Sequence, residues 1–181
     1  MSLEAETVVY ATVFLAIESA GRVDVMARSR EPTLNDQQLD AWRVFLRAHS
    51  ELIRVLDREL EAEQGFPITF FDVLAQLNQA GGRLRMSELA DAVLLSRSGV
   101  TRLVDRMERD GLVKREHCPT DRRAMYATIT PEGKRALAKA RPVHVRGVAE
   151  HFGRYLSDED AKRITAALGR MVPDGVDGDT C

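Results

Sequence analysis

The sequence predicts a mainly helical fold that carries one small β-hairpin. Three features lead to this prediction: a long amphipathic stretch at residues 39–60, two short helices separated by a tight turn at residues 87–109, and two β-prone runs on either side of a turn at residues 112–129. The chain has 181 residues, of which 44% are hydrophobic and 30% are charged. This composition is ordinary for a globular protein, and the length suffices for one domain or two small ones.

Residues 1–36 are interpreted as an N-terminal extension and linker whose status the sequence leaves open. The apolar run at residues 8–17 is shorter than the roughly 20 residues that a membrane span needs, and acidic residues precede it where a secretory signal carries basic ones. One interpretation is a helix that packs on its own chain or on a partner. The other is that translation begins at Met26 and that residues 1–25 are not native.

Residues 37–64 are predicted to form the first long helix. Its apolar stripe recurs at spacings of three and four residues and consists of Leu39, Trp42, Leu46, His49, Ile53, Leu56 and Leu60. A helix with such a stripe needs a partner surface. His49 interrupts the stripe, and we interpret it as a hydrogen-bonded core or interface histidine rather than a ligand or a pH sensor. A shorter helix at residues 69–79 and a short strand at residues 83–85 are expected next.

The next pair of helices, at residues 87–95 and 97–109, has the pattern of a helix-turn-helix. Ser96 is expected to cap the second helix, and Gly111 to end it. The inward stripe of the second helix is Val100, Leu103, Val104 and Met107. The opposite face carries hydroxyls and guanidinium groups, which suit a nucleic-acid groove, although an ordinary solvated face has the same composition.

A hairpin with a cationic tip follows this helix pair. The β-prone runs at residues 112–118 and 124–129 flank a tip that contains Pro119 and two adjacent arginines, and Thr130 with Pro131 is expected to begin a return helix. A helix pair, a hairpin and a return helix together make a winged helix-turn-helix, which we assign to residues 66–130.

The run from Met86 to Gly133 closely resembles the MarR family of bacterial transcription regulators. The order and spacing of the matching segments are specific, and these segments are Ser87–Ala90, Val100–Glu108, Gly111–Arg115, Asp121–Arg123 and Ile129–Gly133. The resemblance implies a helical dimerisation domain built from both ends of the chain, at residues 37–64 and 131–172. Such a homodimer places two recognition helices about 34–36 Å apart on double-stranded DNA, where they read a pseudo-palindromic operator.

The resemblance and the side-chain chemistry together suggest which residues contact DNA: Arg97, Ser98, Thr101, Arg102, Arg122 and Arg123. Ser98, Thr101 and Arg97 are assigned to base edges, and Arg102 to a base or a phosphate. In the wing, Arg123 aligns with the arginine that enters the minor groove in MarR-like proteins, Asp121 would orient it, and Arg122 would contact phosphate. The alternative for the tip is a solvated turn.

The resemblance also implies a small-molecule effector. In this family, phenolic or other aromatic ligands often bind between the dimerisation helices and the winged domain. By that analogy, the candidate ligand-binding residues are Trp42, His49 and Phe70. A repressor relieved by such a ligand is the default of the family, and no cofactor is expected.

The C-terminal part is expected to contain two more helices and a tail. A helix at residues 131–156 should kink or break around residues 138–142, because Pro142 lacks a backbone donor. Ser157 and Asp160 have the spacing of a capping box that begins the last helix. Residues 173–181 are rich in glycine and aspartate and are expected to be disordered.

The distribution of charge agrees with a DNA-binding unit on an acidic carrier. Residues 83–123 contain 10 Lys and Arg against 7 Asp and Glu, whereas the whole chain has a net charge of −2. The two cysteines, Cys118 and Cys181, do not make a disulfide framework, so a reducing cytoplasm without membrane attachment is the expected location.

Three other classes of function are less consistent with the sequence. An enzyme is not expected, because the chain has no glycine-rich phosphate loop, nucleophile turn or His-Glu-x-x-His helix. A metal-responsive regulator could use His144, Glu150 and His151, and a redox-responsive one Cys118 beside basic residues, but core or interface histidines are favoured. The remaining alternative is an interaction adaptor that does not bind DNA.

Overall fold

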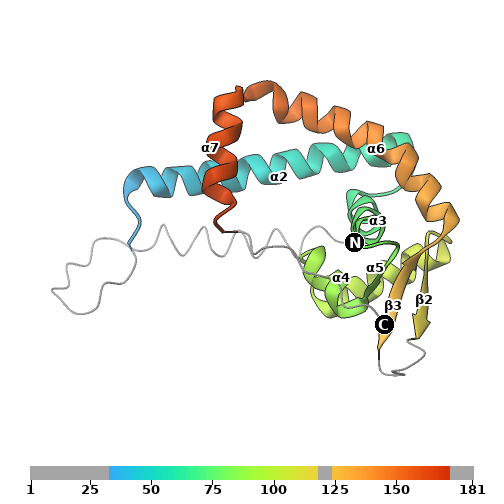
Figure 1. Cartoon of the computed structure of the whole chain (residues 1–181). Coiled ribbons are helices and arrows are strands. Elements are labelled where there is room, and N and C mark those ends of the chain that lie inside the picture. The colour runs from blue at the N-terminus through green and yellow to red at the C-terminus, as the bar shows by residue number, and fades with distance from the viewer. Residues whose placement is uncertain (1–32, 118–123, 172–181) are drawn as a thin grey trace, which may run out of the picture. The chain divides into compact units, whose positions relative to one another are not determined.

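The computed structural model describes residues 33–117 and 124–171. The chain divides into two units after Ala41, so the first turns of α2 belong to one unit and the remaining described elements to the other. The elements, labelled in Figure 1, are α2 (Asp36–Gln64), α3 (Ile68–Gln79), β1 (Arg83–Arg85), α4 (Met86–Ala92), α5 (Arg97–Arg109), β2 (Val113–His117), β3 (Met125–Ile129), α6 (Pro131–His151), the 3-10 turn η1 (Gly153–Tyr155) and α7 (Asp158–Leu168). The predicted mainly helical fold class is thereby confirmed.

The three strands form one antiparallel sheet in the order β1-β3-β2. Ala127 of β3 lies opposite Leu84 on one side and Arg115 on the other. The predicted hairpin and the predicted short strand beside it are therefore both present. Residues 118–123, between β2 and β3, lie outside the described residues, as do residues 1–32 and 172–181. Among the described helices, none has the length and apolar character needed to cross a membrane.

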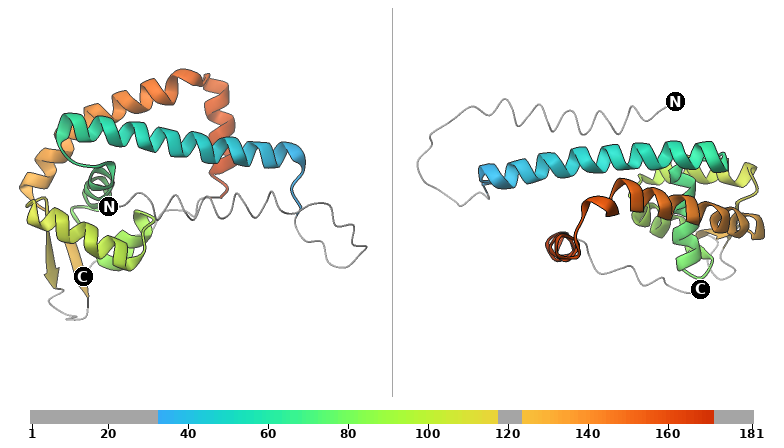
Figure 2. Two further views of the ribbon diagram at one scale, coloured as in Figure 1. Left: turned by 180° about the vertical axis from the view of Figure 1, so that it is seen from behind. Right: turned by 90° about the horizontal axis from the view of Figure 1, so that it is seen from above.

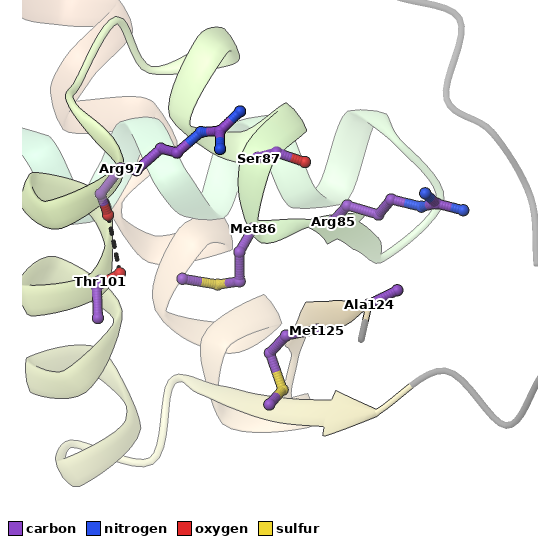
Figure 3. A pocket seen from close by; sticks show the side chains of 7 residues that line it. All are labelled: Arg85, Met86, Ser87, Arg97, Thr101, Ala124 and Met125. Carbon is purple, nitrogen blue, oxygen red and sulfur yellow. Dashed lines mark hydrogen bonds between the residues drawn. The ribbon is translucent and has the colours of Figure 1, made fainter. Parts of the chain in front are cut away.

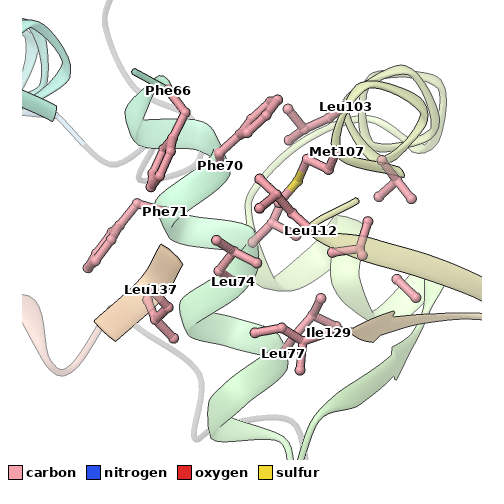
Figure 4. Close-up of a cluster of buried hydrophobic side chains, with 14 of the residues drawn as sticks. Phe66, Phe70, Phe71, Leu74, Leu77, Leu103, Met107, Leu112, Ile129 and Leu137 are labelled. Carbon is pink, nitrogen blue, oxygen red and sulfur yellow. The ribbon is translucent and has the colours of Figure 1, made fainter. Parts of the chain in front are cut away.

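The hydrophobic core of the winged unit is centred on α3. Figure 4 shows side chains of α3, α5, α6 and the sheet meeting around it. Phe70, Leu74 and Leu77 of α3 are buried there. The four predicted inward residues of α5, Val100, Leu103, Val104 and Met107, are also all buried. This packing fixes which face of α5 remains exposed.

The helix ends follow the local chemistry that the sequence predicts. The Ser96 hydroxyl accepts a hydrogen bond from the Gly99 amide at 3.1 Å, and the Thr130 hydroxyl accepts one from Gly133 at 3.0 Å. Ser157 and Asp160 form the expected capping box. Gly111 follows α5 with a φ of 71°, the left-handed conformation that glycine adopts without strain.

Helix α6 continues through Pro142, so the expected break is absent, and the alternative of a kink stays a prediction. Pro142 is exposed, whereas Ala140 and Val143 on either side of it are buried. The proline removes the amide partner of the carbonyl of Ala138, which is an exposed residue, and packing of the buried neighbours holds the helix together. The helix ends at His151 rather than Leu156, and a short 3-10 turn covers the remaining residues.

The part of α2 after Ala41 runs beside α6, from the other end of the chain, in the views of Figures 1 and 2. Glu63 of α2 forms an ion pair with Arg146 of α6. Gly147 of α6 is in close contact with α2, since a Cβ built on it would lie 2.5 Å from a methyl group of Leu56. The earlier part of α2 is different, because Trp42, Val44 and Phe45 are exposed.

The turn between α4 and α5 is strained at Leu94. Helix α4 ends at Ala92, three residues earlier than predicted, and Leu94 then adopts a φ of 54° with its side chain 92% exposed. This conformation costs a non-glycine residue about 1–2 kcal/mol, and an exposed side chain returns little of it.

We therefore expect Leu94→Asn to stabilise the chain by about 1 kcal/mol and to raise the melting temperature by about 2–4 °C, because asparagine tolerates the left-handed region. Thermal unfolding followed by circular dichroism measures this shift. Leu95→Asn is the matched control, and it should destabilise, since Leu95 packs against the core. An unchanged or lower melting temperature for Leu94→Asn would show that Leu94 is not strained.

Candidate nucleic-acid interface

The outer face of α5 is polar and exposed along its first two turns. Arg97, Ser98, Thr101 and Arg102 are all exposed, with Ser98 and Arg102 opposite the buried stripe and Arg97 and Thr101 on its flank in the first turns of the helix. Arg97 and Arg102 form no ion pair with any other described residue, so both guanidinium groups are available to a ligand. The structure thus brings the four residues predicted on this helix together on one surface.

An open hollow of about 350 Å³ adjoins this surface, between α4, α5 and the start of β3 (Figure 3). Its lining residues are Arg85, Met86, Ser87, Arg97, Thr101, Ala124 and Met125. The Thr101 hydroxyl donates to the Arg97 carbonyl at 2.8 Å, which leaves its oxygen lone pairs and its methyl group for a ligand. The hollow therefore combines cationic, hydroxyl and apolar groups.

Arg115 of β2 connects the recognition helix to the sheet. Its guanidinium group forms ion pairs with Asp105 at 2.6 Å and Glu108 at 3.0 Å, and it donates to the Thr101 carbonyl at 3.0 Å. The Arg115 amide also donates to Glu108 at 2.9 Å. These contacts hold α5 at a fixed orientation to the hairpin.

Arg85 is a residue of this surface that sequence reasoning treated only as part of a strand. Its Nε donates to the Tyr126 hydroxyl at 2.9 Å, and its side chain lines the hollow. Arg83 lies over the same ring, 4.9 Å from its centroid. The alternation Arg-Leu-Arg, with Leu84 buried, is the sequence signal that places both arginines on one face.

The wing-tip residues Asp121, Arg122 and Arg123 lie outside the described residues, and so does Cys118. Their predicted roles therefore remain predictions. Strand β2 ends just before this tip in the sequence, and β3 begins just after it.

The three candidate ligand-binding residues lie in two different environments. Trp42 and His49 flank Phe45 on the exposed part of α2, with ring centroids 6.1 Å and 6.2 Å from that of Phe45. Phe70 is buried in the core, where its ring stacks with Phe66 and lies under the Arg106 guanidinium group. Within one chain, these contacts do not bring Phe70 together with Trp42 and His49.

The two histidines considered for a metal site have separate partners. His151 contacts Glu59 of α2 at 2.7 Å. His144 instead stacks on Phe71, with centroids 4.3 Å apart, and its Nδ1 is buried without a hydrogen-bond partner among the described residues. Burial lowers the pKa of His144 below its usual value of 6.5.

This lowered pKa makes the folded chain sensitive to acid. The unfolded chain takes up a proton at His144 near pH 6.5 and the folded chain only at lower pH, so stability is lost as the pH falls below about 6.5. We expect His144→Gln to lose less stability than the unchanged protein between pH 7.5 and pH 5.5. Urea unfolding at the two pH values measures this, with the exposed His117→Gln as control. An equal loss in all three proteins would exclude His144 as the cause.

Comparison with known proteins identifies the family of this chain. Residues 64–124 match the sequence profile of the MarR family. The chain is 32% identical over 129 residues to the uncharacterized HTH-type transcriptional regulator YkoM of Bacillus subtilis, an alignment that covers 71% of this chain and 82% of YkoM.

Two solved structures from Streptomyces coelicolor are similar over most of their length. AbsC, a MarR family transcriptional regulator, is 34% identical with a TM-score of 0.71, over 78% of this chain and 95% of AbsC. Sco3205, a MarR family regulator solved in complex with DNA, is 31% identical with a TM-score of 0.73, over 80% of this chain and 91% of Sco3205. These matches confirm both the resemblance and the expectation that the chain is not an enzyme. The chain belongs to the MarR family of winged helix-turn-helix, DNA-binding transcriptional regulators.

Proposed function

We propose that this chain is a homodimeric repressor that reads a pseudo-palindromic operator and releases it on binding a small aromatic ligand. The observation that carries the proposal is the two-sided character of α5, whose inner face is fully buried while its outer face presents Arg97, Ser98, Thr101 and Arg102. A helix held in this way can enter the major groove with a defined face toward the bases.

The exposed side chains divide between the two kinds of DNA contact. Thr101 already donates its hydroxyl proton within the helix, so it would accept a hydrogen bond or place its methyl group against a thymine methyl. Arg97 and Arg102 would bind phosphates or guanine edges, and Arg123 of the wing would enter the minor groove. The structure of Sco3205 in complex with DNA supports this use of the fold.

The homodimer is supported by exposed apolar side chains on the helices outside the winged unit. Phe45 of α2, Phe152 and Tyr155 after α6, and Met171 after α7 are all exposed in one chain, by 42% to 73%. Large exposed apolar side chains on helices outside residues 66–130 favour an interaction surface there if they form one patch in the dimer. A second copy would cover them and place two α5 helices on one operator.

The proposals that the chain represses transcription and that it binds an aromatic effector are drawn from proteins similar to it. MdtR of Bacillus subtilis and MprA of Escherichia coli are both named as transcriptional repressors. An organohalide-sensing regulator of the same fold was solved in its 2,4-dichlorophenol-bound form. The ring row of Trp42, Phe45 and His49 would offer stacking surfaces to an aromatic effector once a partner chain covers it.

The mass of the protein–DNA complex tests the proposal. A duplex selected by the protein from a random pool should contain a pseudo-palindrome and should bind two chains, as measured by sedimentation velocity. Phenolic compounds would then be screened for release of the labelled duplex. A selected site without two-fold symmetry, bound by a single chain, would contradict the homodimer.

Arg115 should act on DNA affinity as a positioning residue. We expect Arg115→Ala to weaken binding to the selected duplex by about tenfold, because α5 loses its contacts with β2. This fold-change corresponds to about 1.4 kcal/mol of binding free energy. Hydrogen exchange of the α5 amides should rise in the same variant. Lys114→Ala is the matched control. It also removes one positive charge from β2, but Lys114 pairs with Glu116 of the same strand and not with α5. Equal affinities and exchange rates in the two variants would rule out the positioning role.

A further inference from the structure

Three metal-ligating side chains meet where the second half of α2 passes the last turn of α6. They are Glu59 of α2 and Glu150 and His151 of α6, and one ligand atom from each lies within 4.8 Å of the other two. The sequence suggested His144 as the companion of His151, but the structure places His144 against Phe71 and brings Glu59 to His151 instead.

The two oxygens of the Glu59 carboxylate have different surroundings. One oxygen contacts His151 Nε2 at 2.7 Å, whereas the other is buried and has no hydrogen-bond partner among the described residues. That second oxygen lies against Gly147, since a Cβ built on Gly147 would be only 2.6 Å from it. A buried carboxylate oxygen without a partner is unfavourable, so a cation bound at this carboxylate would compensate for it.

The donor set matches the preferences of a borderline transition-metal ion. Zn²⁺ binds imidazole nitrogen and carboxylate oxygen at about 2.0–2.2 Å, and a site with three protein ligands leaves a fourth position for water. Two carboxylates and a neutral imidazole carry a charge of −2, which a divalent ion neutralises. Arg146 of α6, next to Gly147 in the chain, is paired with Glu63 instead of Glu59.

The ligand atoms need only a small rearrangement to surround an ion. Glu150 is exposed and His151 half-buried at the end of α6, so both side chains can rotate toward a centre beside Glu59. A metal ion bound to His151 Nε2 would take the place of the hydrogen bond between His151 and Glu59, with the proton of the neutral imidazole on Nδ1. We propose that Glu59, Glu150 and His151 form a binding site for a divalent ion of the Zn²⁺ type, which joins α2 to the end of α6.

The test uses the full-length, untagged chain with Cys118→Ser and Cys181→Ser, so that thiols do not bind the metal. After removal of metal with a chelator, ZnCl₂ is titrated by calorimetry and its effect on the melting temperature is recorded. We expect saturable binding of one ion per chain and a rise in melting temperature of several degrees, because an ion that binds only the folded chain stabilises it. The visible spectrum of bound Co²⁺ reports the ligand geometry independently.

Variants of the site and two matched controls distinguish it from adventitious binding. Glu59→Gln and His151→Gln should each weaken Zn²⁺ affinity by about 100-fold and abolish the Co²⁺ spectrum. Glu63→Gln, which breaks the neighbouring contact between the same helices, and His144→Gln should bind as the parent chain does. Absence of saturable binding, or equal affinity in His151→Gln and the parent chain, would overturn the proposal.

Discussion

Gly133→Ala is expected to destabilise the chain by about 3 kcal/mol, the upper part of the range for overpacking a tight contact. Gly133 lies in the first turn of α6, where a Cβ would collide with the carbonyl oxygen of Leu112 and lie 2.9 Å from a side-chain atom of Ile129. The Leu112 carbonyl cannot move away, because it also accepts hydrogen bonds from the amide and the hydroxyl of Thr130. A backbone atom held in this way yields much less readily than a flexible side chain.

The measurement is urea unfolding of the two proteins at the same pH. Gly153→Ala is the matched control, since a Cβ there would meet only one atom at an ordinary contact distance of 3.7 Å. The control should change the free energy of unfolding by less than about 1 kcal/mol. If Gly133→Ala is no less stable than Gly153→Ala, the start of α6 does not pack on Leu112 as described.

The double variant Arg102→Ala/Arg123→Ala is expected to lose about 100-fold or more of its affinity for the selected duplex, since each contact to a base is worth about 1–3 kcal/mol. Arg102 is exposed on α5 without an ion pair to another described residue, so its removal should leave the fold intact. Fluorescence anisotropy of a labelled duplex measures the affinity. The dependence of affinity on salt should become less steep, because fewer phosphate counterions are released.

The matched control for this variant is Arg141→Ala/Arg163→Ala. It also removes two positive charges, from exposed positions of α6 and α7, and among the described residues Arg163 pairs with Glu159 one turn away. We expect its affinity to remain within about threefold of the unchanged protein, as for loss of distant surface charge. A loss as large as that of Arg102→Ala/Arg123→Ala would mean that net charge, rather than the α5 and wing surface, determines binding.

Local signals made much of the winged unit predictable from the sequence. Ser96 and Thr130 begin their helices as caps, and Gly111 ends α5, because these roles depend on chemistry within a few residues. The buried stripe of α5 followed from helical periodicity alone. The exposed positions of Ser98, Thr101 and Arg102 follow from that stripe, whereas Arg97 is exposed because it is the first residue of α5.

Contacts between distant segments could not be predicted in this way. The ion pairs of Arg115 with Asp105 and Glu108 depend on how β2 returns past α5, which no local pattern encodes. Of the kink or break expected around Pro142, the break is absent, because tertiary packing of Ala140 and Val143 outweighs the local cost of the proline. The cluster of Glu59 with His151 joins residues 92 positions apart and needed the packing of α2 on α6 to become visible.

The most direct test of sequence-specific DNA binding by the α5 surface compares two dissociation constants at physiological salt. One is measured for a duplex selected by the protein from a random pool, and the other for a scrambled duplex of equal length and composition. We predict a ratio of about 10³ or more in favour of the selected duplex, typical of specific recognition, and a much smaller ratio for Arg102→Ala/Arg123→Ala. Equal dissociation constants for the two duplexes would contradict sequence-specific DNA binding, and would favour an adaptor that uses the fold for another purpose.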